Sequence, residues 1–155
     1  MNTVKHLKGL NSPLSRKRLS SRNAFLYLPS ILVASLLGTY LDLYFVGKQL
    51  YEFPVRPFPD VFSINIVFTL IILPMLIGLY LYLVDKMSKW SRLIFTFFLS
   101  ALVPLIEKKS MQLGFFYHEN QWNHIYSFIG YFLFLLLIWK IFEWVKSEVR
   151  LYMLT

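Results

Sequence analysis

Three ionisable side chains in an otherwise apolar sequence have the chemistry of a candidate binding site: Asp42, Arg56 and Glu107. Asp42 lies within an apolar run. An acid inside a membrane span costs about 2.5–3.5 kcal/mol and is a functional candidate by default. Val46, where the run ends, is only four residues further along. Two interpretations therefore have equal weight: Asp42 belongs to a polar site within the membrane, or it caps a helix at the headgroups.

Glu107 and Arg56 extend this candidate site to two further segments. Glu107 follows the third apolar run and precedes Lys108 and Lys109, which is also the pattern of a solvated helix end. If its carboxyl group approaches that of Asp42, one of the two acids stays protonated unless a cation lies between them. Arg56 is the candidate counter-ion, because its planar guanidinium suits carboxylate or phosphate groups. The alternative is that Arg56 contacts outer headgroups without a specific role.

Residues 118–124 read HENQWNH and contain the accessory candidates His118, Trp122 and His124. The run is not the HExxH zinc signature, because its histidines are six positions apart and do not share a helical face. Trp122 is typical of an anchor at the membrane interface. The chain also has no cysteine, which excludes disulfides, Cys-based metal centres and thiol catalysis. We therefore expect no metal and no cofactor.

The composition of the whole chain is that of a membrane protein. Its 155 residues are 57% hydrophobic and only 15% charged, and long apolar runs alternate with short polar stretches. The net charge of +8 does not indicate a nucleic-acid partner, because no soluble domain remains to carry such a surface. In membrane proteins an excess of positive charge usually sets the topology.

Four apolar segments predict an all-α fold, a polytopic membrane bundle of four transmembrane helices. The expected spans are about 24–46, 61–84, 91–106 and 125–142. They form a transmembrane domain of residues 24–146, which follows a basic arm (1–23) and precedes a short tail (147–155). The third span is the weakest prediction, because only about fourteen apolar residues precede Glu107 against the usual ~20.

Local features refine these spans. Pro74, near the middle of the second span, is expected to kink it. The small residues Ala34, Ser35 and Gly38 predict close packing of the first span against another helix. The basic arm has too little apolar content to fold alone, so we expect it to be flexible or interfacial.

The distribution of Lys and Arg predicts the orientation of the bundle. Twelve of the sixteen lie in the N-terminal arm, in the turn at 85–92 and from residue 140 onward, and four lie in the loops 47–60 and 107–124. The positive-inside rule therefore places both termini in the cytoplasm and the two loops outside. The candidate site then lies at the outer rim, whereas the inner half is expected to carry only flanking Lys and Arg.

The order of these motifs resembles that of a family of small, uncharacterised four-helix integral membrane proteins of endospore-forming Gram-positive bacteria. The resemblance covers residues 25–145 and rests on Asp42, on Glu107, and on the aromatic entry from Trp122 to Tyr126 and Ser127. Its most specific part is the Pro-x-Arg-x-Phe-Pro segment within residues 51–59. It implies a bacterial cytoplasmic membrane and a link to sporulation, and it implies no activity.

The sequence favours a non-enzymatic interaction, scaffold or regulatory subunit of the bacterial cell or spore membrane. Its expected partners are the lipid bilayer, anionic lipids at the basic arm and other membrane proteins, and a homo-oligomer is compatible with the pattern. The alternative is a membrane-embedded enzyme, or a protein that binds lipid or small molecules, with an outward-facing polar site at Asp42, Arg56 and Glu107. Convergence of these three side chains within hydrogen-bonding reach distinguishes the two hypotheses.

Overall fold

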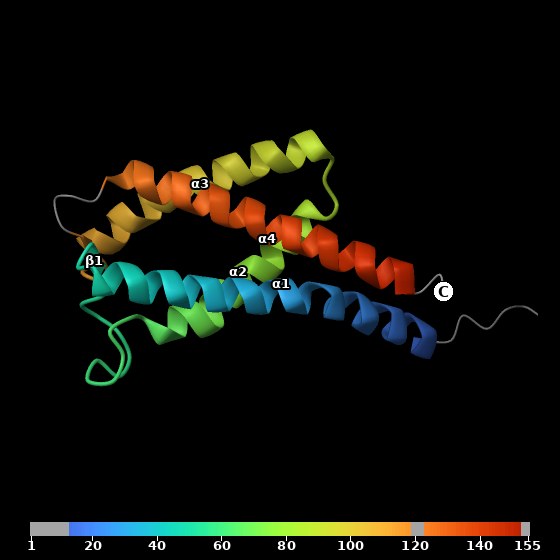
Figure 1. Cartoon of the computed structure of the whole chain (residues 1–155), viewed down its shortest axis with the longest axis horizontal. Helices are drawn as coiled ribbons and strands as arrows, with labels where there is room; N and C mark the ends of the chain where they lie inside the picture. Colours follow the sequence, from blue (N-terminus) through green and yellow to red (C-terminus); the bar gives the residue numbers. More distant parts are fainter. Residues whose placement is uncertain (1–12, 119–122, 153–155) are drawn as a thin grey trace, which may run out of the picture.

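The computed structural model describes the backbone of residues 13–118 and 123–152, and this part of the chain is predominantly helical (Figure 1). Helix α1 spans Pro13–Gly47, a π-helical turn η1 (Phe68–Ile72) leads into α2 (Leu73–Val84), α3 spans Lys89–Gln112 and α4 spans His124–Tyr152. Two short strands, β1 (Tyr51–Glu52) and β2 (Tyr117–His118), pair antiparallel. The prediction of an all-α fold is confirmed.

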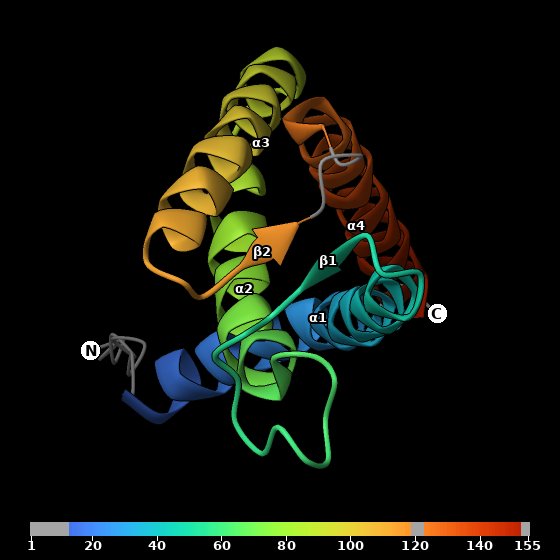
Figure 2. The same cartoon turned by 90° about the vertical axis from the view of Figure 1, so that its left-hand side faces the viewer.

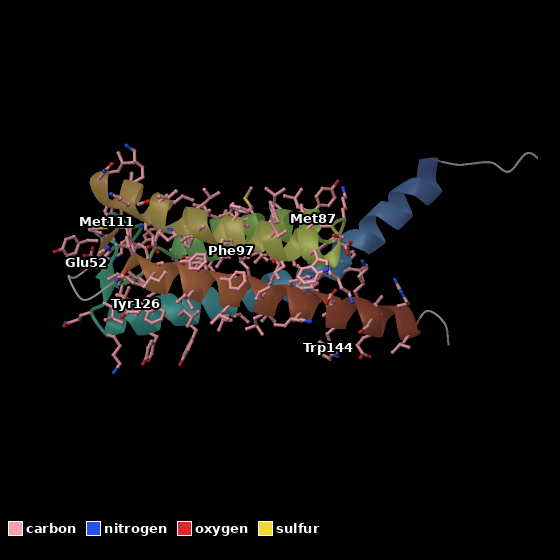
Figure 3. All side chains as sticks on the ribbon, turned by 90° about the horizontal axis from the view of Figure 1, so that it is seen from above. Glu52, Met87, Phe97, Met111, Tyr126 and Trp144 are labelled. Atoms are coloured by element: carbon pink, nitrogen blue, oxygen red, sulfur yellow. The ribbon has the colours of Figure 1, made fainter. Side chains whose placement is uncertain are left out.

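Successive helices run in opposite directions along the long axis, so that α1 begins and α4 ends at the same end of the molecule (Figure 1). Helix α1 packs against both α2 and α4, and α3 packs against α4 (Figure 2). Figure 3 shows Glu52, Met111 and Tyr126 at one end, and Met87 and Trp144 toward the other. We call the first the Asp42 end and the second the Arg92 end, after the ionisable residue at each.

Three of the helices are long and apolar enough to cross a membrane: Phe25–Gly47, Lys89–Gln112 and Ile125–Leu151. Only 17–22% of the residues in their most apolar stretches are buried inside the protein. Apolar surface of this extent would not remain in water, so the three helices suggest a membrane-embedded protein. The fourth apolar helix, Phe68–Val84, is shorter.

The helix boundaries differ from those that the apolar runs indicated. Residues 61–65 are irregular and do not belong to the second helix. That helix begins after Asn65, because the Asn65 side chain caps its first turn by accepting a hydrogen bond from the Phe68 N–H at 3.1 Å. Helix α3 continues through Glu107 to Gln112, and α4 continues to Tyr152. Charged residues end an apolar run but are good helix formers, which explains both extensions.

Part of the basic arm is helical. Residues 13–23 continue α1 toward its N-terminus, whereas residues 1–12 lie outside the described part of the chain. Extending an existing helix requires no new nucleus, so a segment too polar to fold alone can still be helical. Pro13 suits the first turn, where an N–H has no intrahelical partner.

Close packing of α1 against α2 is confirmed at the predicted small residues. Ala34 is fully buried, and a Cβ atom at Gly38 would overlap the Leu73 side chain. In the π-turn the Leu73 N–H donates to the Phe68 carbonyl. The next bond of this pattern would join an N–H of residue 74 to the Thr69 carbonyl, but Pro74 has no N–H. The Ser35 hydroxyl of α1 donates to the Thr69 carbonyl instead, at 2.8 Å. The expected distortion at Pro74 therefore takes the form of a π-turn that α1 stabilises.

Candidate functional site

Asp42 lies near the C-terminal end of α1 and accepts a hydrogen bond of 2.6 Å from the Tyr51 hydroxyl at Oδ1. The helix end brings these residues together. Gln49 adopts a left-handed φ of 58°, the Gln49 N–H donates to Val46 and the Leu50 N–H donates to Phe45. This is a Schellman motif, which reverses the chain so that β1 returns Tyr51 to the helix.

Helix α3 ends in the same way. Gly114 has a φ of 77°, its N–H donates to the Met111 carbonyl at 3.0 Å, and the Phe115 N–H donates to the Ser110 carbonyl at 2.9 Å. The chain then enters β2, where His118 pairs with Tyr51. Two equivalent helix ends therefore create the β1–β2 ribbon, which closes the Asp42 end of the bundle.

The second carboxyl oxygen of Asp42 is the exceptional atom of this end. Oδ2 is buried and accepts no hydrogen bond from any described residue. Burial of a carboxylate oxygen without a donor is costly, and protein interiors rarely contain one that is permanently ionised. A cation or a proton is therefore needed at Oδ2.

Glu107 lies in the same electrostatic environment as Asp42. Both carboxyl groups lie close enough to the Tyr51 and Tyr131 hydroxyls to interact with them electrostatically. Oε2 of Glu107 is buried. Burial first, and then the nearby Asp42 carboxyl, raise the pKa of Tyr51, so its hydroxyl stays protonated and remains a donor at neutral pH. The structure thus groups two of the three predicted site residues, and it adds two tyrosines.

Aromatic rings surround the Tyr51 side chain, which is 9% exposed. Its ring centroid lies 5.9 Å from that of Phe45, 5.5 Å from Phe53 and 5.2 Å from Phe116. The Phe116 ring in turn lies 6.1 Å from that of His118, whose Nε2 is buried. The Tyr51 side chain therefore links Asp42 to a cluster of aromatic rings.

Arg56 does not join the two acids. Its guanidinium donates to the carbonyls of Phe53 at 2.7 Å, Phe62 at 2.7 Å and Pro59 at 3.4 Å. All of its described bonds therefore stay within its own loop, and its predicted role as counter-ion is wrong. The physical reason is local, because Pro54, Pro57 and Pro59 have no N–H and leave carbonyls of this loop without backbone donors.

The accessory candidates are placed only in part. His118 lies on β2, beside this site. His124 begins α4 but its side chain is outside the described residues, as is Trp122. Among the described residues no group of three or more His, Cys, Asp or Glu side chains is arranged to hold a metal ion.

The Arg92 end holds a charged cluster, where only flanking cations were expected. Arg92 is 9% exposed and donates to the carbonyls of Val84 at 2.9 Å and Met87 at 3.0 Å. It also bonds Glu143 on α4 at 3.0 Å, and its guanidinium lies 4.1 Å from the Trp139 ring centroid. One buried side chain thus joins the turn before α3 to α4, and the expectation for this end is corrected.

A second ion pair completes this cluster. Lys146 on α4 bonds Asp85, whose other carboxyl oxygen accepts from the Tyr27 hydroxyl at 3.4 Å. The Tyr27 ring stacks on Phe142, with centroids 4.9 Å apart. The sequence signal for this cluster was the presence of acidic residues in flanks predicted to be cytoplasmic. Such residues offset the positive charge that the topology requires.

A stripe of buried polar residues on α3 was also not predicted from the sequence. Arg92, Thr96 and Ser100 are spaced four residues apart, and all three are buried. The Tyr80 hydroxyl of α2 lies 2.9 Å from the Thr96 hydroxyl. The four-residue spacing of polar residues inside an apolar helix was the signal that such a stripe faces other helices.

Comparison of the chain with protein-family models, with curated proteins and with solved structures finds no match.

Proposed function

We propose that the protein is a membrane-embedded binding protein that takes a positively charged nitrogen group, an amine or a quaternary ammonium, at its Asp42 end. The observation that carries this proposal is the buried Oδ2 of Asp42, which accepts no hydrogen bond from any described residue. Tyr51 already satisfies Oδ1, so the carboxyl group is held in one orientation and Oδ2 is the oxygen that still needs a cation or a proton.

The surroundings of Asp42 favour a cation of this class. Glu107 adds a second carboxyl group to the same environment. The rings of Tyr51, Phe53 and Phe116 form a cluster next to the Asp42–Tyr51 hydrogen bond, and aromatic rings attract ammonium groups by their quadrupole. A hard metal ion would instead prefer six or more oxygen ligands or an octahedral shell. An ammonium ligand therefore fits these side chains better than a metal ion does.

The competing explanation for Asp42 is a proton on Oδ2. A protonated acid would be neutral, would still accept from Tyr51 and would need no ligand. The scaffold hypothesis is compatible with this explanation, since it gives no role to the acid. The binding hypothesis gives it one, and the two differ in whether a cation competes for Asp42.

We further propose that Phe68–Val84, with the helical residues just before it, forms a fourth span, and that the site faces outward from a bacterial cytoplasmic membrane. Two observations support this topology. The described chain begins and ends at the Arg92 end, as an even number of spans requires (Figure 1). Twelve of the sixteen Lys and Arg residues fall in the segments assigned to the cytoplasm.

The test is calorimetric titration of the nanodisc-reconstituted protein with tetramethylammonium chloride and, separately, ethylammonium chloride. Sodium chloride at equal ionic strength is the reference. We expect saturable binding of at least one ammonium ion, weakened about tenfold or more by Asp42→Asn, which is at least ~1.4 kcal/mol. Asp60→Asn is the matched control, because it removes an exposed acid from the loop at the same end and should leave binding unchanged.

Two outcomes contradict the proposal. Equal binding by the wild-type protein and Asp42→Asn would place the ammonium elsewhere. No saturable heat with either ammonium salt would leave the protonated acid as the explanation of the buried oxygen.

A further inference from the structure

The loop that precedes the second helix, residues 53–65, has an unusual construction, and we call it the Arg56 loop. It contains three prolines and no regular secondary structure. Arg56 fastens both halves of the loop, because it donates to Phe53 on one side and to Pro59 and Phe62 on the other. The N–H groups of Val61 and Phe62 both donate to the Phe58 carbonyl at 2.9 Å.

This construction holds apolar side chains outward. Phe58 has a φ of 52°, a left-handed conformation that is unfavourable for a bulky residue and persists only where its surroundings impose it. The side chains of Val55, Phe58 and Val61 are 54%, 68% and 73% exposed. A water-facing loop would gain nothing from holding three such side chains away from the protein.

The length of the second helix indicates what covers them. From Ile66, where the chain becomes helical, to Val84 the helix rises about 28 Å at 1.5 Å per residue. The hydrocarbon core of a bilayer is about 30 Å thick, and tilt shortens the projected length further. The segment directly before Ile66 therefore begins at the boundary of the hydrocarbon.

Irregular backbone at such a depth needs internal partners for its carbonyl groups, because lipid supplies none. The Arg56 guanidinium supplies them, and its charge can reach the headgroup layer from there. The same bonds that exclude Arg56 from the Asp42 site thus have a function of their own.

We infer that the Arg56 loop is an interfacial anchor, which rests on the lipid surface at the Asp42 end with Val55, Phe58 and Val61 inserted among the lipids. Arg56 is the positioning residue that fixes its shape. This inference requires that the helical segment from Ile66 to Val84 crosses the membrane, as proposed above, and it is independent of any ligand at Asp42. Failure of the ammonium titration therefore does not affect it.

The absence of cysteine from the natural sequence allows single-site labelling. The full chain carrying Phe58→Cys is labelled with an environment-sensitive nitrobenzoxadiazole dye and reconstituted into phosphatidylcholine–phosphatidylglycerol vesicles. Asp60→Cys is the matched control, because Asp60 is an exposed polar residue of the same loop. We expect nitroxide lipids to quench the label at 58 several-fold more than the label at 60. Aqueous iodide should show the opposite order.

Val61→Cys gives a second, independent measurement on the far side of the loop and should behave as position 58 does. Arg56→Lys in the Phe58→Cys background retains the positive charge but removes the planar guanidinium that bonds three carbonyls. Iodide should then quench the label at position 58 more strongly, and nitroxide lipids should quench it less. If this variant does not insert, positions 58 and 61 in the natural background still decide the matter. Strong iodide quenching at both positions, with none by nitroxide lipids, would overturn the inference and leave a protein partner as the cover of these side chains.

Discussion

The two ends of the bundle differ in how their charged side chains are partnered among the described residues. At the Arg92 end the guanidinium of Arg92 has two carbonyls and Glu143 as partners, and Asp85 has Lys146 and Tyr27. At the Asp42 end two acids share an aromatic environment, and one carboxyl oxygen accepts no hydrogen bond from the described residues. Each end is polar and partly buried, but among the described residues only Arg92, at the first end, is a buried charge with an opposite charge bonded to it.

This difference separates a structural role from a functional one. Paired charges fix one arrangement of helices, and removing one partner is strongly destabilising because the other charge remains buried. Groups that retain unused capacity in a buried place are instead typical of binding and catalytic sites. The paired charges at the Arg92 end therefore join the helices, and we call them the clasp, whereas the Asp42 end is where we propose that a ligand binds.

The largest expected effect is the loss of the clasp. Arg92→Met removes the donor to Val84, Met87 and Glu143 while keeping much of the side-chain volume. We expect the free energy of unfolding to fall by about 3 kcal/mol, measured by reversible denaturation in mixed micelles. Lys89→Met, an exposed position in the first turn of the same helix, is the control and should change little. Equal effects of both substitutions would remove Arg92 from its structural role.

The next largest effect concerns the bond that orients Asp42. Tyr51→Phe removes the hydroxyl that donates to Oδ1 at 2.6 Å and keeps the ring contacts. A hydrogen bond to a charged group contributes about 1.5–3 kcal/mol, so we expect a loss near the lower limit in the unliganded protein. In the Asp42→Asn background the same substitution should cost much less. Equal cost in both backgrounds would show that the hydroxyl acts on something other than this carboxyl group.

The fold was more predictable from the sequence than the site. Apolar runs identified where each helix lies, and small residues identified the tight crossing at Ala34 and Gly38, because both signals are local. The partners of Arg92 and Asp85 were not predictable, since Glu143 and Lys146 lie 51 and 61 positions away. A positive-inside count treats Arg92 and Lys146 as solvated flanking charges and does not consider the acids. Arg56 was assigned to a carboxylate for a related reason: a sequence shows charges, but it does not show carbonyls that lack a donor.

A smaller effect of opposite sign provides the sharpest contrast between the ends. Asp42→Asn replaces a buried acid, whose Oδ2 accepts no hydrogen bond from the described residues, with a neutral amide, so we expect the unliganded protein to gain about 1 kcal/mol. Glu143→Gln at the Arg92 end should instead lose about 1 kcal/mol, because it weakens a bond to a buried guanidinium whose partner is itself 43% exposed. Denaturation of both variants under identical conditions gives the two signs. Destabilisation by both would mean that the Asp42 end is also a clasp, with its missing donor outside the described residues.

The smallest effect tests how much of the clasp depends on its more exposed pair. The side chains of Lys146 and Asp85 are 37% and 25% exposed, so solvent screens their attraction. A double-mutant cycle with Lys146→Met and Asp85→Asn should therefore give a coupling energy of only about 0.5–1 kcal/mol, and less in high salt. The corresponding cycle for Arg92 and Glu143 should give more, and it should depend less on salt because Arg92 is buried. If the two cycles give the same coupling, burial of Arg92 is not what makes the clasp strong, and its carbonyl bonds to Val84 and Met87 must account for the stability of this end.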